Sequence, residues 1–118
     1  MNTCPTHRRW LWIIVAIAVT ARLAAALLMG ERVEPLPGIH DQISYDTLAQ
    51  RLLAGHGFSF PVAWYPFTPP NQPTAHWSYL YTLTLAGVYA VFGHHPLAAR
   101  LIQALASSLH VWLAYRLV

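Results

Sequence analysis

Residues 10–28 read WLWIIVAIAVTARLAAALL, an apolar run in which Arg22 is the only charged residue. An α-helix needs about 20 mostly apolar residues to cross the hydrocarbon core of a bilayer. We therefore interpret this run as a transmembrane helix. A secretory signal peptide is the alternative, because the small residues Ala24, Ala25 and Ala26 follow an apolar region, as at a cleavage site. The apolar segments further along the chain count against that alternative.

The composition of the whole chain also favours a membrane. The chain has 118 residues, of which 56% are hydrophobic and 9% charged, against roughly 25% charged in an average soluble domain. Its net charge of +3 comes from scattered arginines without any lysine, which argues against nucleic acid as a partner. The single cysteine, Cys4, excludes an internal disulfide and a cysteine-based zinc site.

Two further apolar segments follow, at residues 77–92 and 97–118, and we expect each to cross the membrane. The second of them carries polar residues at intervals of three, four and three, which puts these residues on one helix face: Arg100, Gln103, Ser107 and His110. Polar groups within a span normally face other protein. The expected fold is therefore an all-α integral membrane protein with about three transmembrane helices, a fragment of a larger bundle.

The arginines near the first span predict its orientation. Arg8 and Arg9 precede the span, and positive residues beside a span tend to stay in the cytoplasm. We expect a cytoplasmic N-terminus, an extracytoplasmic loop at residues 30–76 and a cytoplasmic turn at residues 93–96. The expected location is the cell's inner or plasma membrane, with several spans.

Within the expected loop, residues 43–54 have the pattern of a short amphipathic helix. Tyr45, Leu48, Ala49 and Leu52 recur at helical spacing, polar residues including Ser44 and Asp46 occupy the other side, and Gly55 stops the helix. Such a helix is expected to lie along the membrane surface. Prolines and aromatic residues alternate through residues 58–77, which predicts an irregular segment.

Asp41 is the candidate catalytic residue. It lies just after the first span, where its carboxylate would accept a proton from an acceptor hydroxyl or hold a divalent metal. The alternative role is the N-cap of the helix that follows, a position that aspartate favours. Both roles are compatible, because a cap uses only one carboxylate oxygen. A parallel change at Asp46, one turn further along on the polar side of the same helix, is expected to cost little activity.

Arg22 and His76 are candidates for binding a lipid phosphate. Arg22 lies towards the outer end of the first span, where snorkelling to the interface is the alternative role. His76 lies beside Trp77, and the alternative is an ordinary interfacial side chain. The seven histidines contain no His-x-x-x-His pair, so we expect no histidine metal site. The sequence also contains no glycine-rich phosphate loop or nucleotide fingerprint.

These features together resemble the N-terminal part of the polytopic GT-C glycosyltransferases, and most closely the bacterial protein mannosyltransferase-like and aminoarabinose-transferase-like proteins. The resemblance covers residues 9–118, beginning with the first span and its arginine and small residues. It is carried further by Asp41 with Tyr45, Ala49 and Leu52, and by Gly55-His56-Gly57-Phe58, Pro73-Thr74-Ala75-His76-Trp77-Ser78-Tyr79-Leu80-Tyr81, Phe92-Gly93 and Pro96-Leu97-Ala98-Ala99-Arg100-Leu101-Ile102-Gln103.

The resemblance implies an integral membrane enzyme that moves a sugar from a polyprenyl-phosphate donor to an acceptor on the extracytoplasmic side. Asp41 matches the position of that family's acidic catalytic residue. Many members have Asp-Glu there, whereas this chain has Asp41-Gln42, which bears on metal binding more than on base catalysis and leaves a divalent metal open. Members have many more spans, so these 118 residues are not expected to catalyse without further transmembrane helices.

A different class of function also fits the sequence. The chain is then a small non-catalytic integral membrane protein, or an assembly subunit, whose polar third span docks on other helices. Both hypotheses imply membrane lipid as a partner, together with remaining transmembrane helices or a partner subunit.

Overall fold

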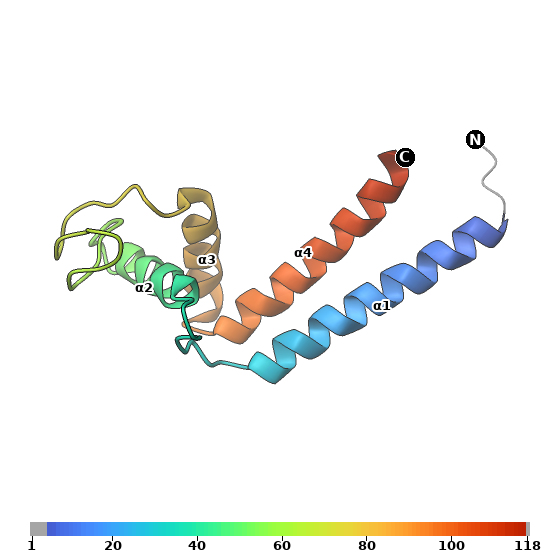
Figure 1. The fold of residues 1–118 in the computed structure, drawn as a ribbon, viewed down its shortest axis with the longest axis horizontal. Helices are drawn as coiled ribbons and strands as arrows, with labels where there is room; N and C mark the ends of the chain where they lie inside the picture. The colour runs from blue at the N-terminus through green and yellow to red at the C-terminus, as the bar shows by residue number, and fades with distance from the viewer. Residues whose placement is uncertain (1–4, 118) are drawn as a thin grey trace. The chain divides into compact units, whose positions relative to one another are not determined.

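The computed structural model describes residues 5–117, which form four α-helices and, within that range, no β-strand (Figure 1). The helices are α1 (Pro5–Met29), α2 (Asp41–Leu53), α3 (Tyr79–Phe92) and α4 (Pro96–Leu117). The all-helical expectation is confirmed. Cys4 and Val118, the last residue of the expected third span, lie outside the described range. The chain divides into two compact units, one with α1 and most of α4, the other comprising residues 31–96.

Helices α1 and α4 are each long and apolar enough to cross a membrane. At about 1.5 Å per residue, the 21 residues of Arg9–Met29 and the 22 of Pro96–Leu117 rise about 32 and 33 Å, against about 30 Å of hydrocarbon. Large apolar side chains are exposed along both helices, among them Ile17, Leu28 and Leu105. Exposure to water would cost about 25 cal/mol per Å² of that surface, so these helices are suited to lipid or to other helices.

The polar residues of α4 bind backbone carbonyls. Ser107 and Ser108 donate to the carbonyl of Ala104 at 3.0 and 2.7 Å, and Nδ1 of His110 lies 3.0 Å from the carbonyl oxygen of Ala106. Arg100 donates to the carbonyl of Gly30, which follows the end of α1. We expected the polar residues of this face to bind neighbouring helices. Several of them instead form hydrogen bonds with backbone carbonyls of the same unit.

Helix α3 is shorter than the other apolar helices. Its 14 residues rise about 21 Å, well under the thickness of the hydrocarbon core. Ser78 caps its start by accepting from the backbone N–H of Tyr81, and Gly93 ends it with a φ of 81°. One face is buried at helical spacing, through Thr82, Leu85, Ala86 and Tyr89. Helices α2 and α3 pack together.

The other side of α2 packs on the irregular segment that follows it. Leu48, Phe60 and Trp77 form a buried cluster, against which Tyr45 and Trp64 pack. The expected amphipathic helix is confirmed, with bounds 41–53 rather than 43–54. Leu48 and Ala49 are 0% exposed, so protein covers this part of its apolar side, and its expected place along the membrane surface stays a prediction. Leu48 and Ala49 are therefore not available to lipid.

Residues 54–78 contain no helix or strand, which confirms the predicted irregular segment. Isolated bridges join Ser59 to Pro73 and Trp64 to Thr68. Arg51 ties the segment to α2 by donating to the hydroxyl of Ser59 at 3.1 Å and to Oδ1 of Asn71 at 2.8 Å. The segment is thus irregular in backbone but fixed by specific contacts.

Candidate functional site

Asp41 is the first residue of α2 and its side chain is exposed. The expectation that it forms the N-cap is wrong: His40 occupies that position, and no side-chain hydrogen bond caps the helix. Asp41 lies instead in the first turn, where a carboxylate interacts favourably with the helix dipole. Its carboxylate has no hydrogen bond or ion pair with the residues that the structure describes.

Asp46, which lies on the predicted polar side of α2, is buried, with only 8% of the residue exposed. Oδ1 accepts from the hydroxyl of Tyr89 at 2.6 Å and from Nε2 of His94 at 2.9 Å, and Oδ2 accepts from the Gln50 amide at 2.8 Å. The expectation that Asp46 lies on an exposed polar side is therefore corrected, while the small effect on activity expected of a change there stays a prediction. Three donors from α2, α3 and the turn after α3 meet at this carboxylate.

The chemistry of these contacts assigns the proton on His94. A carboxylate only accepts hydrogen bonds, so Nε2 of His94 carries a hydrogen. The ring of His94 also contacts Tyr89 edge-on, with centroids 4.9 Å apart. Asp46 is thus a satisfied acceptor, and the cluster fixes α2 against α3 rather than offering a free oxygen to a substrate.

The second contact that fixes α2 begins at Ser44. Its hydroxyl donates to the carbonyl of His40 at 3.0 Å and accepts from Nε1 of Trp64 at 2.8 Å. Trp64 in turn stacks on Phe60, with ring centroids 5.4 Å apart. Since Ser44 lies one turn after Asp41, these contacts hold the backbone of the turn that carries the exposed carboxylate.

His76 is exposed, and its ring contacts two aromatic neighbours. The centroids lie 5.2 Å from Trp77 and 6.1 Å from Tyr65. No hydrogen bond, ion pair or ring contact joins His76 to Asp41 among the described residues. Arg22 belongs to the other unit, where it is exposed and donates to the carbonyl of Ala18 at 3.1 Å, one turn back along α1. A role of either residue in binding a lipid phosphate stays a prediction.

Metal-binding side chains do not gather in the described part of the chain. Across residues 5–117, no three His, Cys, Asp or Glu side chains come together in a way that would hold a metal ion. The two histidine contacts with acids, His94 with Asp46 and His95 with Glu31 at 3.3 Å, are separate pairs.

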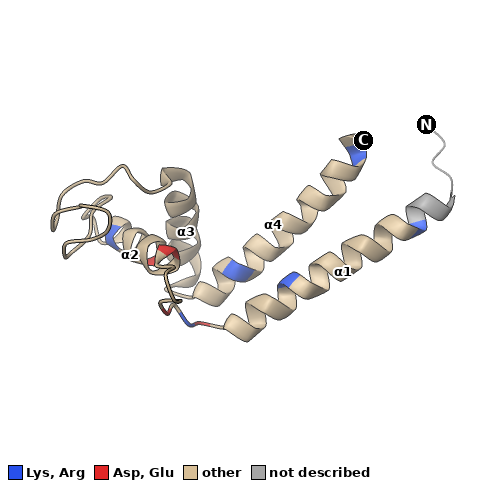
Figure 2. Cartoon of the chain, in the orientation of Figure 1, with Lys and Arg blue, Asp and Glu red and all other residues tan. Residues whose placement is uncertain are grey.

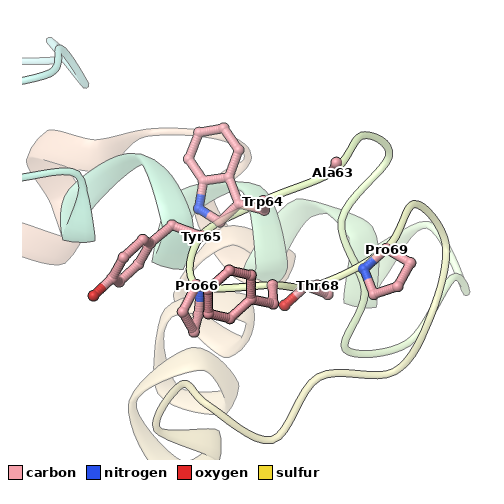
Figure 3. A pocket seen from close by; sticks show the side chains of 7 residues that line it. Ala63, Trp64, Tyr65, Pro66, Thr68 and Pro69 are labelled. Carbon is pink, nitrogen blue, oxygen red and sulfur yellow. The ribbon is translucent and has the colours of Figure 1, made fainter.

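An open hollow lies on the irregular segment, lined by residues 63–69 (Figure 3). Its walls are mostly aromatic and proline side chains, and it contains no acid or base. It is therefore suited to apolar contact and offers no catalytic group.

Asp46 is the residue that sequence reasoning missed. Its partners Tyr89 and His94 lie 43 and 48 positions away, so the helical pattern of α2 gives no indication of them.

The chain matches no protein-family model, no curated protein and no solved structure.

Proposed function

We propose that the chain is the N-terminal membrane portion of a glycosyltransferase, which moves a sugar from a polyprenyl-phosphate donor to an acceptor on the extracytoplasmic side. The observation that carries the proposal is the state of Asp41: an exposed carboxylate without a side-chain partner among residues 5–117, on a helix that buried contacts hold in place. The motif resemblance described above supplies the reaction class.

In this reaction Asp41 acts as the general base. Its carboxylate takes the proton of the acceptor hydroxyl while that oxygen forms a bond to the anomeric carbon of the sugar. The bond from that carbon to the phosphate oxygen breaks, and its electron pair leaves with the polyprenyl phosphate. Positive charge near the leaving phosphate lowers the barrier. Arg22 and His76 are the proposed sources of that charge, with the remaining transmembrane helices supplying the rest of the site.

The geometry favours Asp41 over Asp46 as the base. Both oxygens of Asp46 already accept hydrogen bonds, and only 12% of its side chain is exposed. A substrate hydroxyl would have to displace Tyr89, His94 or Gln50 before it reached this carboxylate. Asp41 requires no such displacement.

The alternative is a non-catalytic assembly subunit, in which the polar face of α4 binds neighbouring helices. That argument is weaker because Ser107, Ser108 and His110 form hydrogen bonds with carbonyls of their own helix. The exposed apolar side chains of α1 and α4 fit either hypothesis, because lipid and other helices cover them equally well.

The test is Asp41→Asn in the complete gene product, measured as transfer of labelled sugar from polyprenyl-phosphate donors in isolated membranes. Asparagine keeps the size of the side chain but cannot take the proton. Transfer should fall by roughly 100-fold or more, the effect typical of losing a general base, at an unchanged protein level.

The matched control is Glu34→Gln, which removes the same charge from another exposed acid of the same unit. It should leave transfer near normal. Near-normal transfer by Asp41→Asn would overturn the assignment of the base. Absence of transfer by the unmodified protein with every donor offered would instead favour the assembly subunit.

A further inference from the structure

The tip of the irregular segment exposes large aromatic side chains to an unusual degree. Phe67 is 95% exposed and Tyr65 is 69% exposed, while Val62 before them is 54% exposed. Soluble proteins often expose single apolar residues. A cluster of exposed apolar side chains is instead typical of a surface that binds a membrane or another protein.

The tip cannot easily fold back to cover these rings, because its base is fixed. The backbone N–H groups of Trp64 and Thr68 each donate to the carbonyl of the other residue at 2.9 Å, closing the loop around residues 65–67. Trp64 is itself anchored through its Nε1 to Ser44 and through its ring to Phe60. Figure 3 shows Trp64 and Tyr65 extending from the loop in different directions. Trp64 is anchored inward, whereas Tyr65 contacts the exposed His76 ring edge-on and stays 69% exposed.

The chain on either side of the tip contains no acid, lysine or arginine. Between Arg51 and Arg100 the sequence contains no Asp, Glu, Lys or Arg. In Figure 2 the whole segment between α2 and α3 is drawn without blue or red, as is α3. Inserting residues 65–67 into the headgroup region would therefore bury no Asp, Glu, Lys or Arg side chain of this segment, and burying such charged groups is the main cost of placing polypeptide in a membrane.

We infer that this loop is a membrane anchor, in which Phe67 and Tyr65 insert into the interface of the bilayer that α1 and α4 cross. The unit of residues 31–96 is joined at both ends to a helix of spanning length, so the chain itself keeps it at the membrane. Aromatic side chains favour the interface between headgroups and acyl chains. The inference needs only that α1 and α4 span, and is independent of the proposed sugar transfer.

A fluorescent label at position 67 tests the anchor directly. In the Cys4→Ser background, Phe67→Cys provides the only cysteine for a bimane label, and the protein is reconstituted in phospholipid vesicles. An amphipathic anchor reaches about 5–10 Å into the headgroup and acyl boundary. Nitroxide lipids labelled near the headgroup end of the acyl chain should therefore quench the bimane, and aqueous iodide should not. Because the side chain is so exposed, the substitution should leave folding intact.

His56→Cys with the same label is the control. His56 is exposed in the turn after α2, so its label should be quenched by iodide and not by the lipid. Iodide quenching at position 67 would overturn the inference by showing a tip in water. Protection from both quenchers would overturn it by showing a tip covered by protein. Equal lipid quenching at both positions would also overturn it, since the label itself would then account for the result.

Discussion

At the scale of single residues, Asp46 connects parts of the chain that no local pattern relates. Its carboxylate joins α2 to Tyr89 in α3 and to His94 in the turn that follows. Hydrogen bonds to a charged group contribute about 1.5–3 kcal/mol each, more than neutral ones. Asp46 therefore adds to the contacts that fix α2 against α3, among them the edge-on ring contact of Tyr45 with Tyr81.

We predict that Tyr89→Phe lowers stability by about 1–3 kcal/mol, because it removes a donor 2.6 Å from a buried carboxylate and leaves the ring in place. The measurement is the midpoint temperature of thermal unfolding of the detergent-purified protein. Tyr65→Phe is the matched control, since that hydroxyl is exposed and makes no hydrogen bond in the described structure. Equal midpoints for the two variants would contradict the role assigned to Asp46.

At the scale of elements, α2 ends in a motif that depends on glycine. The N–H of His56 donates to the carbonyl of Arg51 at 2.9 Å, and the N–H of Gly55 donates to that of Leu52 at 3.1 Å. These are the two bonds of a Schellman motif, with Gly55 in the left-handed region at φ 80°. The chain turns here from α2 into the segment that contains the loop.

Two glycine-to-alanine changes should therefore act in opposite directions. Gly55→Ala should destabilise by about 1–2 kcal/mol, because alanine is strained at positive φ even where its Cβ meets nothing. Gly87→Ala, inside α3 and equally uncrowded, should stabilise by up to about 1 kcal/mol through helix propensity. Thermal unfolding of the purified variants compares them. A lower unfolding midpoint for Gly87→Ala would mean that another part of the protein packs closely against α3 at that glycine.

At the scale of the whole molecule, the contact between Asp46 and His94 bears on how the chain crosses the membrane. The sequence places residues 30–76 outside and residues 93–96 inside, with a span between them. In the structure these two segments contact each other at 2.9 Å within one compact unit, and α3 is about 21 Å long. Two spans, α1 and α4, with residues 31–95 on one side, agree with this contact.

We predict that residues 56 and 91 lie on the same, outer side of the membrane. In the Cys4→Ser background, a membrane-impermeant maleimide should label both His56→Cys and Val91→Cys in intact cells, since both positions are exposed. The orientation follows from Arg8 and Arg9 before the first span. Labelling of Val91→Cys only after permeabilisation would restore α3 as a membrane span.

The sequence by itself determined the properties that depend on local pattern. The apolar runs predicted α1 and α4, the recurrence of Leu48 and Leu52 predicted α2, and the prolines between Phe58 and Trp77 predicted the irregular segment. Each of these elements follows from residues close together in the sequence, because hydrophobic periodicity and the backbone restriction of proline both act over a few residues. The resemblance that suggested a glycosyltransferase also came from the sequence alone, and it stays a prediction.

Only the tertiary structure decided which faces are covered and which of the two carboxylates of α2 is buried and hydrogen-bonded. The polar pattern around Asp46 predicts exposure, but Tyr89 and His94 bury it from more than 40 residues away. The apolar face of α2 is suited to lipid, yet Leu48 packs on Phe60 and Trp77. Burial and pairing are properties of residues distant in sequence, and a single chain's local periodicity contains no information about them.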